Sequence, residues 1–167
     1  MKELRQIRDA VIGALRDAGL EAEAAFPAKW AAERETALAT VAVGAAEGKA
    51  LGLCGYLGQT RGAGGEIREV YGKRLEGRIT VDLRAARAAD CEDGAETAAA
   101  VLLGGLPEGI RPGELRWEAL AWEKGTGLFL RRGELRCEAL FLAEAGEAEG
   151  VFLDFQLKGV LRSERSA

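Results

Sequence analysis

The chain has 167 residues and a net charge of -4, from 23 Lys and Arg against 27 Asp and Glu. This length suits a single domain over residues 1–167, large enough to form a hydrophobic core without disulfides or metals. Apolar residues make up 48% of the chain and charged residues 30%. Those fractions exclude a disordered acidic tail, and the negative charge excludes a basic nucleic-acid-binding module, so we expect no specific nucleic-acid binding.

Several residue types that catalytic sites use are missing. There is no His and no Asn, and the serines are Ser163 and Ser166 near the end of the sequence. Without His, neither a Ser-His-Asp nor a Cys-His nucleophile system can be assembled from this chain. We therefore expect no catalytic residues, no cofactor and no metal, so the protein is not expected to be an enzyme. The abundant carboxylates leave a carboxylate-dependent hydrolase open as an alternative.

The three cysteines, Cys54, Cys91 and Cys137, include no C-x-x-C pair. Their wide separation disfavours a structural zinc site and a thioredoxin-like motif. We expect all three to be buried, reduced thiols in the core. The odd cysteine count, with no apolar secretory segment after Met1, predicts a cytoplasmic protein. No apolar run approaches the ~20 residues of a membrane span, so we expect no membrane association.

The sequence begins with an amphipathic helix. Apolar residues recur at helical spacing over residues 3–18, charged residues occupy the other face, and Gly19 follows as a stop. A short strand is predicted over Leu20–Phe26. The connection that follows, over Trp30–Glu35, has no clear period.

Two further segments predict a hairpin and a loop. Thr36–Val43 mixes β-branched and small apolar residues, as a half-buried strand does, and Ala50–Leu57 is interpreted as its hairpin partner across Gly44–Lys49. Gly58–Glu66 then has four glycines and no apolar anchor. We expect this segment to be a flexible loop or a hairpin tip.

An alternating strand and a second helix come next. Ile67–Tyr71 is extended, and Arg74–Arg84 alternates, with Leu75, Ile79, Val81 and Leu83 facing inward. A helix is predicted over Cys91–Leu103. Asp90, Glu92 and Asp93 allow two interpretations, a divalent-metal site or a helix cap, and the cap is favoured with Asp90 as the N-cap.

The last third predicts strands only, with a turn at Arg131–Gly133. The strands are expected over Leu115–Trp122, Leu128–Leu130, Leu135–Leu142 and Val151–Leu161. GELRWEAL at Gly113–Leu120 and GELRCEAL at Gly133–Leu140 are identical at seven of eight positions. Two such strands would present matching faces in one sheet, although chance similarity in so Glu/Arg/Ala/Leu-rich a chain is the alternative.

This order of elements predicts an α+β fold, a mainly antiparallel β-sheet with two main helices packed on it. The glycines at 52–65 do not form a phosphate-binding loop, because they join strand to strand rather than strand to helix. Trp117 lies at an apolar position of its alternating strand and is assigned to the core. Trp122 is assigned to either the core or an interface, and Trp30 is left open.

Three stretches resemble the phage tail terminator family. ELRQIRDAVIGALRDAG (Glu3–Gly19) is similar to its opening helix, RITVDLRAARAADCEDGAETAAAVL (Arg78–Leu102) to its strand, linker and second helix, and LRWEALAWEKGTGLFLRRGELRCEALFLAE (Leu115–Glu144) to its closing hairpin. The predicted strand at Val151–Leu161 extends past the family's usual end.

The resemblance implies a structural tail protein of a phage or prophage. Terminators form hexameric rings that cap the tail tube and join it to the head, without catalysis. The expected partners are other copies of the chain, the tail tube and head-completion proteins, first in the host cytoplasm and then in the virion tail. We assign Arg61, Arg68, Arg131 and Arg132 to the subunit and tail-tube interface. The alternative is an intracellular protein-binding adaptor domain without catalysis.

Overall fold

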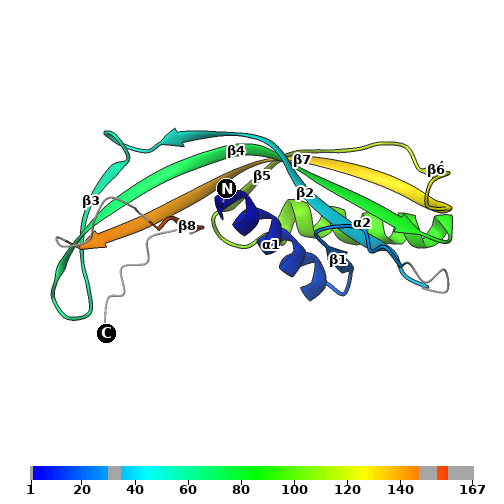
Figure 1. Cartoon of the computed structure of the whole chain (residues 1–167), viewed down its shortest axis with the longest axis horizontal. Coiled ribbons are helices and arrows are strands. Elements are labelled where there is room, and N and C mark those ends of the chain that lie inside the picture. The colour runs from blue at the N-terminus through cyan, green and yellow to red at the C-terminus, as the bar shows by residue number, and fades with distance from the viewer. Residues whose placement is uncertain (1, 30–34, 147–153, 158–167) are drawn as a thin grey trace.

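A computed structural model describes residues 2–29, 35–146 and 154–157 (Figure 1). The helices are α1 (Lys2–Asp17) and α2 (Ala88–Gly104). The strands are β1 (Glu21–Glu23), β2 (Leu38–Ala50), β3 (Tyr56–Arg61), β4 (Ile67–Ala85), β5 (Ile110–Trp117), β6 (Ala121–Glu123), β7 (Leu128–Gly146) and β8 (Gln156–Leu157).

One long sheet carries both helices on the same face, which confirms the predicted α+β fold (Figure 1). Its strand order is β1-β2-β4-β7-β5, with β3 paired to β4 and with β6 and β8 paired to β7. Among the strands that the structure describes, only β1 and β2 pair in parallel. β4 and β7, of 19 residues each, pair from Arg68 and Gly146 to Ala85 and Phe129. They form the long central pair of strands in the sheet.

The core lies between the sheet and the helices because β4 alternates as its sequence predicts. Leu75, Ile79, Val81 and Leu83 are buried. The helices contribute Val11 and Leu15 from α1 and Ala98 and Leu102 from α2, and β7 contributes Leu135 and Phe141. The even-numbered side chains of the central part of β4 lie on the other face, which no helix covers.

The duplicated GELR segments lie beside each other in the sheet, as their likeness suggested. β5 and β7 pair antiparallel, with Leu115 opposite Leu135 and Arg116 opposite Glu134. Antiparallel pairing of the same short sequence places an acid opposite a base on the open face and two leucines on the helix side.

Gly133 is required by this pairing, since Trp117 lies over it. A Cβ at Gly133 would come within 2.6 Å of the Trp117 ring. We expect Gly133→Ala to lower the free energy of unfolding by about 1–3 kcal/mol through overpacking. Urea unfolding of both proteins checks this, with Gly125→Ala as control, because a Cβ at Gly125 meets nothing within 4 Å.

The hairpin predicted between Thr36–Val43 and Ala50–Leu57 is wrong. β2 continues without a turn to Ala50 and pairs with β4, and β3 also pairs with β4. At residues 51–55 the chain makes a local turn, where Gly52, Cys54 and Gly55 have positive φ angles, and β3 then continues along β4 in the same direction as β2. Gly44–Lys49 forms a β-bulge and more strand, because small side chains fit an exposed edge as well as a turn.

Two other local predictions are corrected. Arg131–Gly133 is not a turn, because β7 continues through it without a break. Gly133 lacks a side chain because the Trp117 ring lies over it. Asp90 is not the N-cap: Arg87 holds that position without a side-chain cap bond, and Asp90 lies in the first turn, where it accepts bonds from Arg87 at 2.7 and 3.0 Å.

The remaining predictions concern turns and ends. The hairpin tip predicted at Gly58–Glu66 is narrower, since β3 extends to Arg61 and the tip spans residues 62–66. Of the strand predicted at Val151–Leu161, residues 154–157 lie in the described part, with β8 at Gln156–Leu157, and of Trp30–Glu35 only Glu35 is described.

Candidate assembly surfaces

The four arginines assigned to an interface lie in two separate places. Arg61 and Arg68 lie at the end of the sheet where β3 turns into β4. Arg132 lies opposite Asp82, and Arg68 and Asp82 are both on β4. Fourteen residues of strand separate them, roughly 45 Å at about 3.3 Å per residue. The structure therefore does not bring the four together into one site.

Most of these arginines bind acidic groups of the same chain. Arg132 holds Asp82 with two bonds of 2.7 and 2.8 Å, and Arg131 holds Glu92 of α2 at 2.7 Å. Arg68 lies 3.4 Å from Glu66. Asp82 raises the pKa of the Arg132 guanidinium. Arg61 forms no ion pair with a described residue, so it is the cation of this set that is most available to a partner.

The end that carries Arg61 projects past the helices. We call residues 51–72 and 142–146 the arm; it consists of the β3 hairpin and the adjoining ends of β4 and β7 (Figure 1). Of the six large apolar side chains exposed among the described residues, four belong to the arm: Leu53, Tyr56, Leu57 and Ile67. Leu53, Tyr56 and Leu57 lie at one end of β3 and Ile67 at the other, and this share of the exposed apolar side chains favours the arm as a contact surface.

Leu53 is held outward by a hydrogen-bonded turn and is 83% exposed. Its carbonyl accepts a hydrogen bond from the Tyr56 amide at 3.0 Å. The Leu51 amide donates to the Gly72 carbonyl at 3.0 Å, and the Gly72 amide donates to the Gly55 carbonyl at 2.8 Å. A Cβ at Gly72 would come within 2.6 Å of Leu57 and 3.2 Å of Leu51. The arm thus has a small packed interior and presents Leu53 at a defined position.

Cys54 lies in the same turn, which overturns the expectation that all three cysteines are buried. Cys54 is exposed, and Cys91 and Cys137 are buried. Burial raises the pKa of both buried thiols to about 11. The sequence placed Cys54 in a strand, where its side chain would have packed inward, but the chain turns there.

We predict that one thiol per chain reacts rapidly with a thiol reagent at pH 8 in the native protein, because only the exposed thiol is accessible. All three react after unfolding. In a Cys54→Ser variant, no thiol reacts rapidly. Rapid labelling of Cys91 or Cys137 in native protein would contradict this packing.

The opposite end of the sheet carries Trp122, which is 56% exposed and packs edge-on against Phe129 with ring centroids 5.1 Å apart. Between core and interface, the exposure favours an interface. Trp117 is half-buried against the core, in agreement with its phase, and Trp30 lies outside the described residues.

Glu123, beside Trp122, is bonded by Arg84 at 2.7 and 3.0 Å and by the Thr126 hydroxyl at 2.6 Å. These donors, Arg84 first, lower the pKa of Glu123 from 4.5 to about 2. A depressed folded-state pKa adds stability above the unfolded value, and this stability is lost as the pH falls from about 4.5 towards 2.

We predict that Glu123→Gln lowers the free energy of unfolding by about 1–3 kcal/mol at pH 6, because a hydrogen-bonded charge pair is broken. The difference from the unaltered protein should narrow below pH 4.5, the pKa of an unperturbed Glu, and approach zero near pH 2, the pKa of Glu123 in the folded protein. Thermal unfolding across this range measures it. A difference that stays constant with pH would contradict the assignment.

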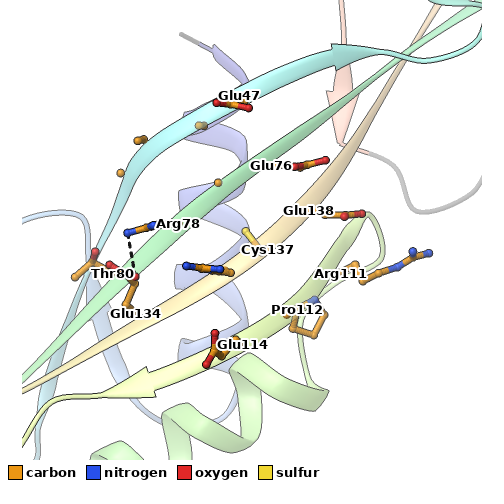
Figure 2. A pocket seen from close by; sticks show the side chains of 16 residues that line it. Glu47, Glu76, Arg78, Thr80, Arg111, Pro112, Glu114, Glu134, Cys137 and Glu138 are labelled. Carbon is orange, nitrogen blue, oxygen red and sulfur yellow. Dashed lines mark ion pairs between the residues drawn. The ribbon is translucent and has the colours of Figure 1, made fainter.

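The uncovered face of the sheet forms an open groove of about 1210 Å³ lined by charged side chains (Figure 2). Like charges stand opposite each other across strands: Glu47, Glu76 and Glu138 in one row, and Arg78 and Arg136 in the next. Bonds between rows compensate them, as Arg78 to Glu134 at 3.4 Å and Arg74 to Glu76 at 3.1 Å show. The groove suits a charged macromolecular surface better than a small molecule.

Among the described residues, no three His, Cys, Asp or Glu side chains are arranged to hold a metal ion. Asp90, Glu92 and Asp93 of the metal interpretation lie in the first turns of α2, and two of them bond to arginines. No helix in the described ranges is long and apolar enough to span a membrane. Comparison with known protein families and with curated proteins finds no match.

Proposed function

We propose that this protein is a structural tail terminator of a phage or prophage, which forms a ring of six copies on the end of the tail tube and joins the tube to the head. It acts by contact and not by catalysis. Other copies of the chain, the tube protein and head-completion proteins are its partners.

The observation that carries this proposal is the arm. Its hydrogen-bonded turn holds an almost fully exposed leucine, Leu53, beyond the helices, next to Tyr56 and Leu57, and Arg61 and Ile67 lie at the other end of β3. A projecting segment of this kind binds a protein surface, and in a terminator that surface belongs to the tube. The resemblance of the helices and the closing hairpin to the terminator family supports the same role.

Removal of the gene from the phage or prophage tests this function. We expect free heads, and tails of irregular and excessive length, because nothing would cap the growing tube. A copy of the gene supplied in trans should restore tails of uniform length joined to heads. Normal virions from the deletion strain would contradict the proposal and would favour the intracellular adaptor, for which the arm would bind another protein.

A further inference from the structure

Two long edges of the sheet have no partner strand in the part of the chain that the structure describes. On one side, β1 pairs only with Leu38–Thr40, which leaves Val41–Ala50 of β2 open. On the other side, β5 is the outermost strand. Open edges present backbone N–H and C=O groups to which another strand can pair.

The two edges match in direction. β2 pairs antiparallel with β4, β4 with β7, and β7 with β5, so β2 and β5 run in opposite directions. Copies lying side by side in the same orientation would therefore join β5 of one copy to β2 of the next as a further antiparallel pair. Small side chains at Ala45, Ala46 and Gly48 permit close approach at the β2 edge.

The helix beside the β2 edge presents arginines outward. Arg5, Arg8 and Arg16 share one stripe of α1, because they are spaced by three and eight residues; Asp9 lies in the same stripe and pairs with Arg8 at 2.8 Å, whereas Arg5 has no ion pair with a described residue. Arg16 donates a bond to the Ala22 carbonyl at 2.9 Å and lies 3.1 Å from Glu23 of β1. The stripe therefore faces the β1 and β2 side of the molecule.

The helix beside the β5 edge has the opposite charge. α2 contains four acidic residues and no Lys or Arg. Glu92, Glu96 and Leu103 share a stripe, and the bond from Arg131 to Glu92 places it on the β7 side. Gly94 lies on the other flank, towards Leu20 and Ala37. The stripe thus faces away from α1, and its Leu103 is 52% exposed.

We propose that copies of this chain assemble side by side, with the β2 edge and arginine stripe of one copy against the β5 edge and acidic stripe of the next. Such a contact joins two different surfaces. If each copy is rotated relative to the previous one so that the last copy meets the first, the assembly is a closed ring. Pro112 and the bulges in both edges limit the length of the shared ladder. The arm stays free at the end of the sheet. The proposal deepens the ring of the proposed function and rests on that function only for the ring's place on a tail.

Cysteine cross-linking of the purified full-length protein tests the contact. In a Cys54→Ser background, Ala42→Cys places a thiol on β2 and Arg116→Cys one on β5, both on the uncovered face. With both cysteines and a short bifunctional maleimide, we expect a ladder of oligomers beyond the dimer. Each single variant alone should remain monomeric, and a mixture of the two should give dimers. A double variant without a ladder, or a single variant that forms dimers, would overturn the arrangement.

Charge exchange tests the helices separately. Arg5→Glu and Glu96→Arg should each reduce the cross-linking yield roughly fivefold to tenfold, since each replaces attraction by repulsion. Combining both in one chain should restore it, whereas Glu138→Arg on the uncovered face should leave it unchanged. No loss in the single variants, or no recovery in the combined one, would remove the helices from the contact.

The outcomes separate the contact from the function. A ladder of cross-linked oligomers, together with normal virions from the deletion strain, would support side-by-side assembly and reject the terminator role. Defective tails in the deletion strain, without a ladder, would retain the role and reject this contact.

Discussion

Replacing Phe141 with alanine is expected to lower the free energy of unfolding by about 3–5 kcal/mol. Phe141 is the largest fully buried side chain in the described residues, on β7 opposite Lys73 and Leu157. Its removal leaves a cavity between the sheet and the helix layer that rigid strands on both sides cannot close. A domain of this size has only about 5–15 kcal/mol in total, so the melting temperature should fall by roughly 10 °C.

Urea and thermal unfolding of the purified protein measure this effect. Phe141→Leu is the matched control, since it keeps most of the buried volume and should cost under about 1.5 kcal/mol. A loss below about 1 kcal/mol for Phe141→Ala would mean that the helices do not pack on this part of the sheet.

Leu53→Asp is expected to leave the fold intact and to abolish function. Leu53 is 83% exposed, so its substitution should change the free energy of unfolding by no more than about 0.5 kcal/mol. If Leu53 anchors the arm in a partner, a buried aspartate costs at least ~2 kcal/mol per copy, about thirtyfold in affinity, and several copies in a ring multiply the loss.

Complementation of the gene deletion measures this second effect. Leu53→Asp should fail to restore joined tails at normal protein levels, and Leu53→Met, which keeps an apolar side chain, should restore them. Full complementation by Leu53→Asp would show that the arm tip makes no essential contact.

The predictions that succeeded rest on the regular spacing of apolar residues in elements that pack on the same core. β4 and α1 each bury one face in the core between the sheet and the helices. The spacing of Leu75, Ile79 and Val11 therefore identifies the buried face from the sequence alone. The duplicated GELR segments could be placed in one sheet because their alternation is the same. Their direct pairing depends on Gly133 beneath Trp117, which only the structure shows.

The predictions that failed concern glycine and polar residues within strands. Gly133 was interpreted as part of a turn, but it makes room for an aromatic ring. Arg131 and Arg132 resembled a turn, but each is held in the strand by an ion pair: Arg132 bonds Asp82 on the uncovered face, and Arg131 bonds Glu92 of α2 on the helix side. The hairpin at Ala50–Leu57 failed for a related reason: alternation does not state which strand is the partner, and β2 and β3 both pair with β4.

The arm could not be predicted for the same reason. Its existence depends on β4 and β7 pairing over 18 residue pairs, beyond the region that the helices cover, and pairing length is a property of the tertiary structure. The sequence did single out Arg61 in the arm. It gave no sign that Leu53 is exposed, since leucines in an alternating segment are usually buried.

A cryo-electron microscopy reconstruction of the junction between head and tail in purified virions tests the terminator role most directly. We expect a closed ring of copies of this chain at the end of the tube, with the arm directed at the tube protein. A junction whose density is fully explained by other proteins, in virions that lack this chain, would contradict the role.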